Sequence, residues 1–356
     1  MPLPQWLNLL ETLGGLVGAE PDAPEESRRV MLGRSLGVLG ALAGAWALSS
    51  PETAAASDRP GRPSRRRRKR EDAWFNARTV LAFPLAAYEL PRTGGQLAES
   101  MLAGWKDVFT LRDPRRAIWF EGGRYPAVDK LTIDISGATA KTGKPGSKKK
   151  RPELRPFMPG TLRSLAVKNF VFRAAPIYHY KAQVNFYVTG TDVRFDLRQD
   201  MTGRPLLLLS DAKAGSLHFR STCGDLERLL IAGGRPKAAQ HAVNLRDVDI
   251  HLNSVTPRSV KLDMKVRTLI GGFLPAGLRF RARVDVDDRM NAHIWGLACD
   301  GDEALGPLIV NFIRPGLAKY EGKTRPLLSF PTGAMRLHDL RIRAGETVEL
   351  AAAFGR

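Results

Sequence analysis

The chain of 356 residues has little cysteine and none of the short motifs that mark common enzymes. Its two cysteines, Cys223 and Cys299, have no second cysteine or histidine at metal-ligand spacing, which argues against a structural zinc site. We interpret them as buried free thiols, with a disulfide as the alternative if the protein is exported. The six histidines are scattered singly, and there is no HExxH, GxSxG, P-loop or strand-linked GxGxxG motif. The sequence therefore predicts no bound metal, no cofactor and no enzymatic activity.

One acidic group needs separate consideration. Asp285, Asp287 and Asp288 lie close together in the sequence VDVDDR, where calcium binding or acid–base chemistry is conceivable. Two of them alternate outward from an expected strand, and the third opens its turn. We interpret all three as surface carboxylates.

Positive charge is in large excess. The formal net charge is +19 at pH 7, and part of it comes from the runs 65–70 (RRRRKR) and 148–151 (KKKR). Such a balance predicts an anionic partner, either lipid headgroups or nucleic acid. The runs contain no interleaved aromatic residues and no nucleic-acid-binding motif accompanies them, so nucleic acid is the less favoured alternative. The residues expected to contact an anionic membrane surface are Arg65, Arg66, Arg67, Arg68, Lys69 and Arg70.

The first 56 residues have the layout of an export signal. Arg28 and Arg29 follow a serine and precede an uncharged run over 35–48, and three alanines at 54–56 supply a small-residue cleavage pattern. The run is about 14 residues long, shorter than a membrane span. The paired arginines resemble a twin-arginine signal, with Met31 and Gly33 as departures from its usual pattern. We expect export to the cell envelope and association with its membrane. Because basic residues follow the run, an uncleaved anchor that leaves the domain cytoplasmic is the alternative.

The composition divides the rest of the chain into a linker and a domain. Residues 57–73 contain Pro, Gly, Arg and Ser with almost nothing apolar, which predicts a disordered basic linker. Residues 74–356 form the expected globular domain, interrupted by a polar, exposed loop over 141–152. We therefore expect three parts with boundaries at 56 and 73.

Apolar and polar residues alternate with a period of two over much of the domain, which is typical of strands with one buried face. The pattern covers residues 182–188 and 193–197, 248–252, 260–266, 280–286, 340–342 and 348–354. It predicts a turn at Gly190 and another at Gly345. The fold class is therefore strand-rich α+β.

Two helices are expected. Thr222 and Asp225 frame a helix start, and the glycines at 233–234 end that helix. A second, very apolar helix begins near Pro307 and is broken around 315–316. The apolar faces of the two helices consist of Leu226, Leu229, Leu230, Ile309, Phe312 and Ile313.

The sequence DLERLL at 225–230, the alternating strands, the apolar helix, RPLLSFP at 325–331 and the final LHDLRI and GETVEL segments together resemble the LmeA-type phospholipid-binding proteins of bacterial envelopes. The likeness covers about residues 125–355, while the loop from Lys141 and the basic linker depart from the family pattern. The resemblance implies a strongly bent antiparallel sheet wrapped around one or two apolar helices, similar to tubular lipid-binding modules. It also implies that the six helix residues lie near a lipid, while for any single one of them a place in the core is the favoured alternative.

These observations together predict a protein that binds phospholipid or another amphipathic ligand by burying its acyl chains, without catalysis. The main alternative is a structural envelope or membrane-associated scaffold whose interior is filled by its own side chains.

Overall fold

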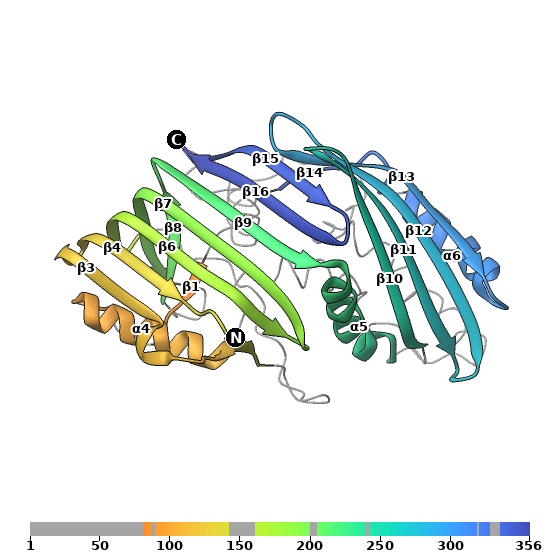
Figure 1. Cartoon of the computed structure of the whole chain (residues 1–356), viewed down its shortest axis with the longest axis horizontal. Helices are drawn as coiled ribbons and strands as arrows, with labels where there is room; N and C mark the ends of the chain where they lie inside the picture. Colours follow the sequence, from red (N-terminus) through yellow and green to blue (C-terminus); the bar gives the residue numbers. More distant parts are fainter. Residues whose placement is uncertain are drawn as a thin grey trace, which may run out of the picture.

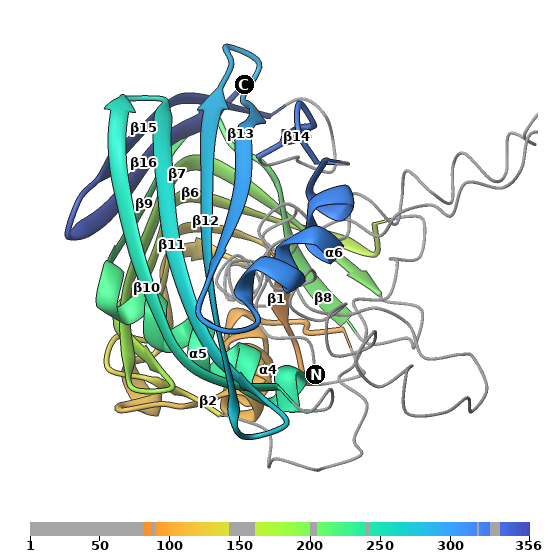
Figure 2. The same cartoon turned by 90° about the vertical axis from the view of Figure 1, so that its right-hand side faces the viewer.

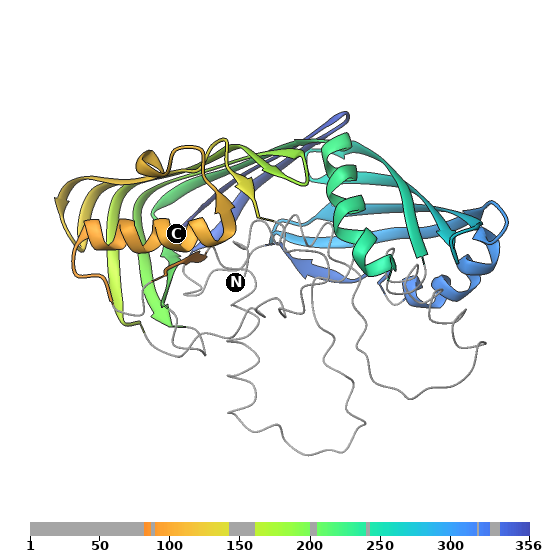
Figure 3. The same ribbon diagram turned by 90° about the horizontal axis from the view of Figure 1, so that it is seen from below.

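The computed structural model describes residues 82–86, 90–141, 161–199, 205–239, 243–318, 320–327 and 335–356. Figure 1 shows two broad sheets side by side, and Figure 3 shows them curving over one side of the molecule, where the helices lie. The prediction of a strand-rich α+β fold is confirmed. The export signal with Arg28 and Arg29, the linker with its run Arg65 to Arg70, and most of the loop 141–152 lie outside the described residues.

The first sheet contains eleven strands, and its central path runs in the order β15-β16-β9-β7-β6-β4-β3. The short strands β1, β2, β5 and β8 join this path at its sides. The strands of this sheet are β1 (Ala82–Pro84), β2 (Phe109–Thr110), β3 (Ile118–Arg124), β4 (Ala127–Asp134), β5 (Thr139–Ala140), β6 (Arg163–His179), β7 (Ala182–Gln199), β8 (Pro205–Asp211), β9 (Ala214–Thr222), β15 (Arg336–Ala344) and β16 (Thr347–Gly355).

The second sheet is a five-stranded antiparallel sheet in the order β10-β11-β12-β13-β14. Its strands are β10 (Val243–Thr256), β11 (Ser259–Ile270), β12 (Leu274–Val286), β13 (Asn291–Asp302) and β14 (Thr324–Pro326). It lies in sequence between β9 and β15, so the chain leaves the first sheet, builds the second, and returns. Figure 2 views the molecule from the side of this second sheet.

Three α-helices lie beside the sheets: α4 (Gly94–Val108), α5 (Cys223–Ala239) and α6 (Gly306–Ala318). Helix α4 contacts β1, β2 and β3; α5 contacts β7, β9 and β10; α6 contacts β12 and β13. A single-turn 3₁₀ helix spans Pro114–Arg116. In the described part of the chain, no helix is long and apolar enough to cross a membrane.

The sheet arrangement corrects one implication of the family resemblance. There are two open sheets rather than one sheet wrapped around helices, and the first is mixed because β4 and β5 pair with β6 in parallel. The helices lie along the inner side at separate positions (Figure 3). The alternation of apolar and polar residues predicts which side chains face inward, but it does not predict which strands pair with one another.

Two local predictions are wrong at glycines. Strand β7 runs straight through Gly190, and the hairpin turn lies instead at Tyr180 and Lys181, both with positive φ. A Cβ at Gly190 would lie 2.6 Å from the Val193 side chain, so this glycine provides space inside the strand. Helix α5 likewise continues past Gly233 and Gly234 to Ala239. The turn at Gly345, between β15 and β16, is confirmed.

The core of the first sheet is aromatic. Trp105, on α4, lies with its ring centroid 5.5 Å from Phe109 and 5.9 Å from Phe172. Phe83 and Phe170 extend this packing towards β7. The alternating buried positions of β6 and β7 point to this core, as the period of two requires. Helix α4 is therefore held to the sheet chiefly by hydrophobic burial.

Candidate functional site

The predicted helix residues divide between the core and its margin. Leu226 and Leu229 on α5, and Ile309 and Ile313 on α6, are buried at 7%, 5%, 0% and 2% exposure. Leu230 is partly buried at the edge of the core, and the side chain of Phe312 lies outside the described residues. Because α5 contacts β10 and α6 contacts β13, the two groups lie at different strands of the second sheet. Their packing is that of core residues, and their contact with a lipid stays a prediction.

Helix α5 begins as the sequence predicts. The hydroxyl of Thr222 accepts a hydrogen bond from the Asp225 backbone N–H at 3.1 Å and donates to the Asp225 carboxylate at 2.7 Å. The same carboxylate accepts from the Gln183 N–H of β7 at 3.0 Å. Two residues further on, the Glu227 carboxylate accepts from the Ile250 N–H of β10 at 2.8 Å. Two carboxylates near the start of α5 thus attach the helix to both sheets.

A row of apolar side chains crosses the inner side of the first sheet. The registers place Phe186 of β7 opposite Phe219 of β9, Phe219 opposite Leu350 of β16, and Leu350 opposite Ile342 of β15. Directly opposed residues share one face of a sheet. Phe186 is 5% exposed, whereas the other three are only partly buried. The row is thus fully buried at β7 and only partly buried on β9, β16 and β15.

We call the partly buried apolar positions of these three strands the inner strip. Its members are Leu217 and Phe219 on β9, Leu337 and Ile342 on β15, and Val348 and Leu350 on β16.

The inner strip lies between the regions covered by α4 and α5. Helix α4 packs against the β1, β2 and β3 side of the sheet, and the principal contacts of α5 are with β10. Leu337, Ile342 and Leu350 pack on one side against a small cluster that includes Val286 of β12 and Met290 of the turn that follows. The members of the strip are therefore apolar and only partly covered where the two sheets meet.

Charge is segregated from this surface. On β9, β15 and β16 the inward positions hold only apolar residues, glycine and serine. The outward positions of the same strands carry ionic side chains, among them Arg220 and Glu349, whose charged atoms lie 3.3 Å apart. An uncharged inner side and a charged outer side match an apolar ligand on the inner side.

The outer side of the second sheet is a lattice of ion pairs. Arg279, Arg281 and Arg283 follow one another on β12 and pair with Asp263, Asp300 and Asp285. The hydrogen bond from Arg279 lowers the pKa of Asp263 below its usual range. Because each arginine is matched by a carboxylate, this face offers little net charge to an anionic ligand.

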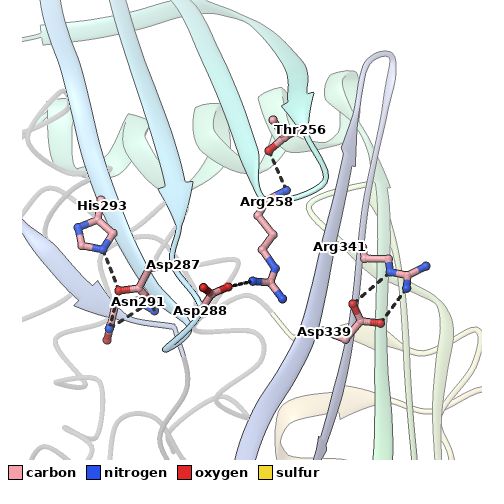
Figure 4. A network of polar contacts seen from close by, with 8 residues as sticks. All are labelled: Thr256, Arg258, Asp287, Asp288, Asn291, His293, Asp339 and Arg341. Atoms are coloured by element: carbon pink, nitrogen blue, oxygen red, sulfur yellow. Dashed lines mark hydrogen bonds and ion pairs between the residues drawn. The ribbon is translucent and has the colours of Figure 1, made fainter.

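The acidic turn after β12 has a structural role. Figure 4 shows the Asp287 carboxylate accepting hydrogen bonds from Asn291 and lying beside His293, while Asp288 pairs with Arg258. The hydrogen bonds from the Asn291 side chain and backbone, followed by that from His293, lower the pKa of Asp287. These contacts close the β12–β13 turn and tie it to the β10–β11 turn. Of the three aspartates, only Asp285 lies on the strand.

His293 also contacts Thr324, with 2.9 Å between Nδ1 and the hydroxyl oxygen. An aspartate–histidine–hydroxyl chain can activate a nucleophile in enzymes. Here His293 and Thr324 are directly paired residues of β13 and β14, so strand pairing accounts for their contact. Across the described ranges, no three His, Cys, Asp or Glu side chains gather to hold a metal ion.

The two cysteines are free thiols and do not form a disulfide. Burial, and then the nearby Asp300, raise the pKa of Cys299 to about 12. Cys223 is partly buried, and burial raises its pKa as well. Both are therefore free thiols, as interpreted from the sequence, but only Cys299 is buried.

Comparison of the chain with protein-family models, with curated proteins and with solved structures finds no match.

Proposed function

We propose that this protein binds phospholipid, or another amphipathic ligand with acyl chains, along the inner strip and without catalysis. The observation that carries the proposal is the row Phe219, Leu350 and Ile342, which stays partly exposed although it lies on the inner side of a curved sheet. Each buried CH₂ of an acyl chain contributes about 0.8 kcal/mol, so a strip spanning three strands offers a large apolar contact. The resemblance to LmeA-type proteins supports the same ligand class.

The site differs from the one expected from the helices. Leu226, Leu229, Ile309 and Ile313 already bury their side chains in protein, so they have little surface left for a ligand. Leu230, at the margin of α5, is the described member of that set best placed to line a ligand together with the strip. In this proposal the helices shape the surface and the strands provide most of it.

Membrane association and a location in the cell envelope belong to the same proposal. The basic run Arg65 to Arg70 would attract anionic headgroups at roughly 1 kcal/mol per residue near the surface. Binding of nucleic acid by these runs is an alternative that predicts an affinity falling steeply with salt.

The test is native mass spectrometry with lipid extraction on the full chain, purified in high salt. We expect a stoichiometric phospholipid in the unmodified protein and a substantial loss of it in Leu350→Asn, which places an amide within the strip. The matched control is Ala351→Asn, because residue 351 is next to Leu350 on the same strand but its side chain points to the outer side of the sheet. If the protein contains no lipid and takes none up from vesicles, the lipid-binding proposal is wrong and the scaffold alternative is favoured. If both variants lose lipid equally, the inner strip is not the binding site.

A further inference from the structure

The two most exposed large apolar side chains in the described part of the chain lie at one end of the second sheet. Phe273 is 73% exposed in the turn between β11 and β12, and Leu308 is 57% exposed in the first turn of α6. The backbone N–H of Leu305, just before α6, donates to the Pro275 carbonyl at 3.3 Å. Since Pro275 follows Phe273 by two residues, the turn and the helix start are neighbours.

The turn holds Phe273 outward through glycine. Gly271 and Gly272 have φ values of 61° and 87°, as a tight turn with two left-handed residues requires. The Phe273 N–H donates to the Ile270 carbonyl at 3.4 Å and closes the turn. A bulky aromatic residue is therefore fixed at the tip of a hairpin, with its ring mostly in solvent.

Glycines also fix the start of α6. A Cβ at Gly301 of β13 would collide with the carbonyl of Gly306, and a Cβ at Gly306 would lie 2.6 Å from the Gly277 carbonyl oxygen of β12. The helix start thus lies directly on the backbone of two strands. This close approach holds the first turn of α6, which carries Leu308, at the same end of the sheet as the hairpin tip.

We propose that this end of the second sheet, which we call the docking edge and define by Phe273 and Leu308, inserts into the surface of a phospholipid membrane. A bilayer accepts protruding apolar side chains without a complementary pocket, whereas a protein partner would need one. Leu274 and Leu305 carry the apolar inner side up to this edge, where they pack partly buried against the core. The docking edge goes beyond the proposed function, since it concerns the membrane and not the bound ligand.

Charges of both signs surround the edge, which leaves insertion to its apolar side chains. The sequence of α6 contains a single charged residue, Arg314, which is exposed. Asp302 at the end of β13 and Glu303 in the connection before the helix are exposed, and so are Arg246 on β10 and Arg267 on β11. Arg267 is also matched by Asp247 at 3.8 Å, so charge contributes little to headgroup contact and insertion is apolar.

The test must separate this edge from the N-terminal region, which is itself expected to bind membranes. We place an environment-sensitive fluorescent label on Phe273→Cys, and for comparison on Val255→Cys, in full chains that also carry Cys223→Ser. Val255 is the matched control because it is 44% exposed near the β10–β11 turn, at the opposite end of the same sheet. Vesicles of phosphatidylcholine with phosphatidylglycerol are added in high salt, which screens electrostatic binding.

We expect the label at 273 to shift its emission to the blue and to be quenched by spin-labelled acyl chains, while the label at 255 stays in water. A label at 273 that remains in water, or equal changes at both positions, would overturn the proposal.

A second measurement uses the double variant Phe273→Ser with Leu308→Ser and its control Val255→Ser. Loss of two apolar contacts should weaken vesicle association about tenfold or more in the double variant and leave the control unchanged. Co-purifying phospholipid should be retained in both. Unchanged vesicle association in the double variant would refute the docking edge while leaving ligand binding at the inner strip intact.

Discussion

The attachment of α5 to both sheets leads to a stability prediction that can be worked from its contacts. Asp225 is 7% exposed and accepts hydrogen bonds from Thr222, from the Gln183 N–H and from Arg228. In Asp225→Ala the Gln183 N–H loses this acceptor, which costs about 1–3 kcal/mol when the group stays buried. The favourable placement of a carboxylate in the first helical turn adds about 0.3–1 kcal/mol. The ion pair with the half-exposed Arg228 adds no more than about 0.5 kcal/mol.

We therefore expect Asp225→Ala to lower the free energy of unfolding by about 2–4 kcal/mol. Asp225→Asn is the matched control, because it keeps an oxygen acceptor for the Gln183 N–H and loses only the charge. It should cost about 0.5–1.5 kcal/mol. Urea denaturation followed by tryptophan fluorescence and circular dichroism measures both values, and coincidence of the two signals tests whether the sheets unfold together. A cost below about 1 kcal/mol for the alanine variant, or equal costs for both variants, would refute the reasoning.

Three further predictions concern other parts of the structure. Gly301→Ala should separate the start of α6 from β13, because its methyl group would collide with Gly306. We expect a lower melting temperature and faster hydrogen exchange of the α6 amides, and an unchanged melting temperature would contradict this. Near pH 8 Cys223 should react with a thiol reagent well before Cys299, whose pKa of about 12 leaves almost no thiolate, and unfolding should equalise the two rates. Because the pKa of Asp287 is lowered in the folded protein, its contribution to stability is fully present above the unfolded value of about 3.9 and is lost as the pH falls below that value. In a plot of unfolding free energy against pH, Asp287→Asn should therefore have a flatter acid limb and a lower stability near pH 7 than the unmodified protein. An acid limb equal to that of the unmodified protein would contradict the assignment.

The sequence predicts the strands of this fold well where apolar and polar residues alternate, and it predicts a helix start well where capping residues are present. The alternating segments at 260–266 and 348–354 lie on β11 and β16, and Thr222 with Asp225 begins α5 as expected. Helix α4 was not predicted, although Thr93 and Gln96 carry the signal of a capped start and Leu97, Met101 and Trp105 recur with helical spacing. The glycines at 94, 95 and 104 have low helix propensity and conceal that signal.

The candidate site was harder to predict than the elements. The inner strip depends on Leu350 lying opposite Phe219, a pairing between residues that are separated in sequence by the whole second sheet. Strand alternation places each of them on one face, but it does not identify the partner strand. The predicted helix residues form the apolar faces of α5 and α6, and the same property accounts for the burial of Leu226, Leu229, Ile309 and Ile313 in the core.

The insertion of the second sheet between β9 and β15 also affects the order of folding. Strands β10 to β13 pair in sequence, so that meander makes local contacts as soon as its residues are synthesised. One side of β9 has no hydrogen-bonded neighbour until residues 347–355 are synthesised, because β16 pairs with that side. During synthesis β9 therefore presents unpaired backbone groups beside Leu217 and Phe219, as would any product truncated before β16. Such intermediates are prone to pair with other chains, so the last strand protects the protein against aggregation.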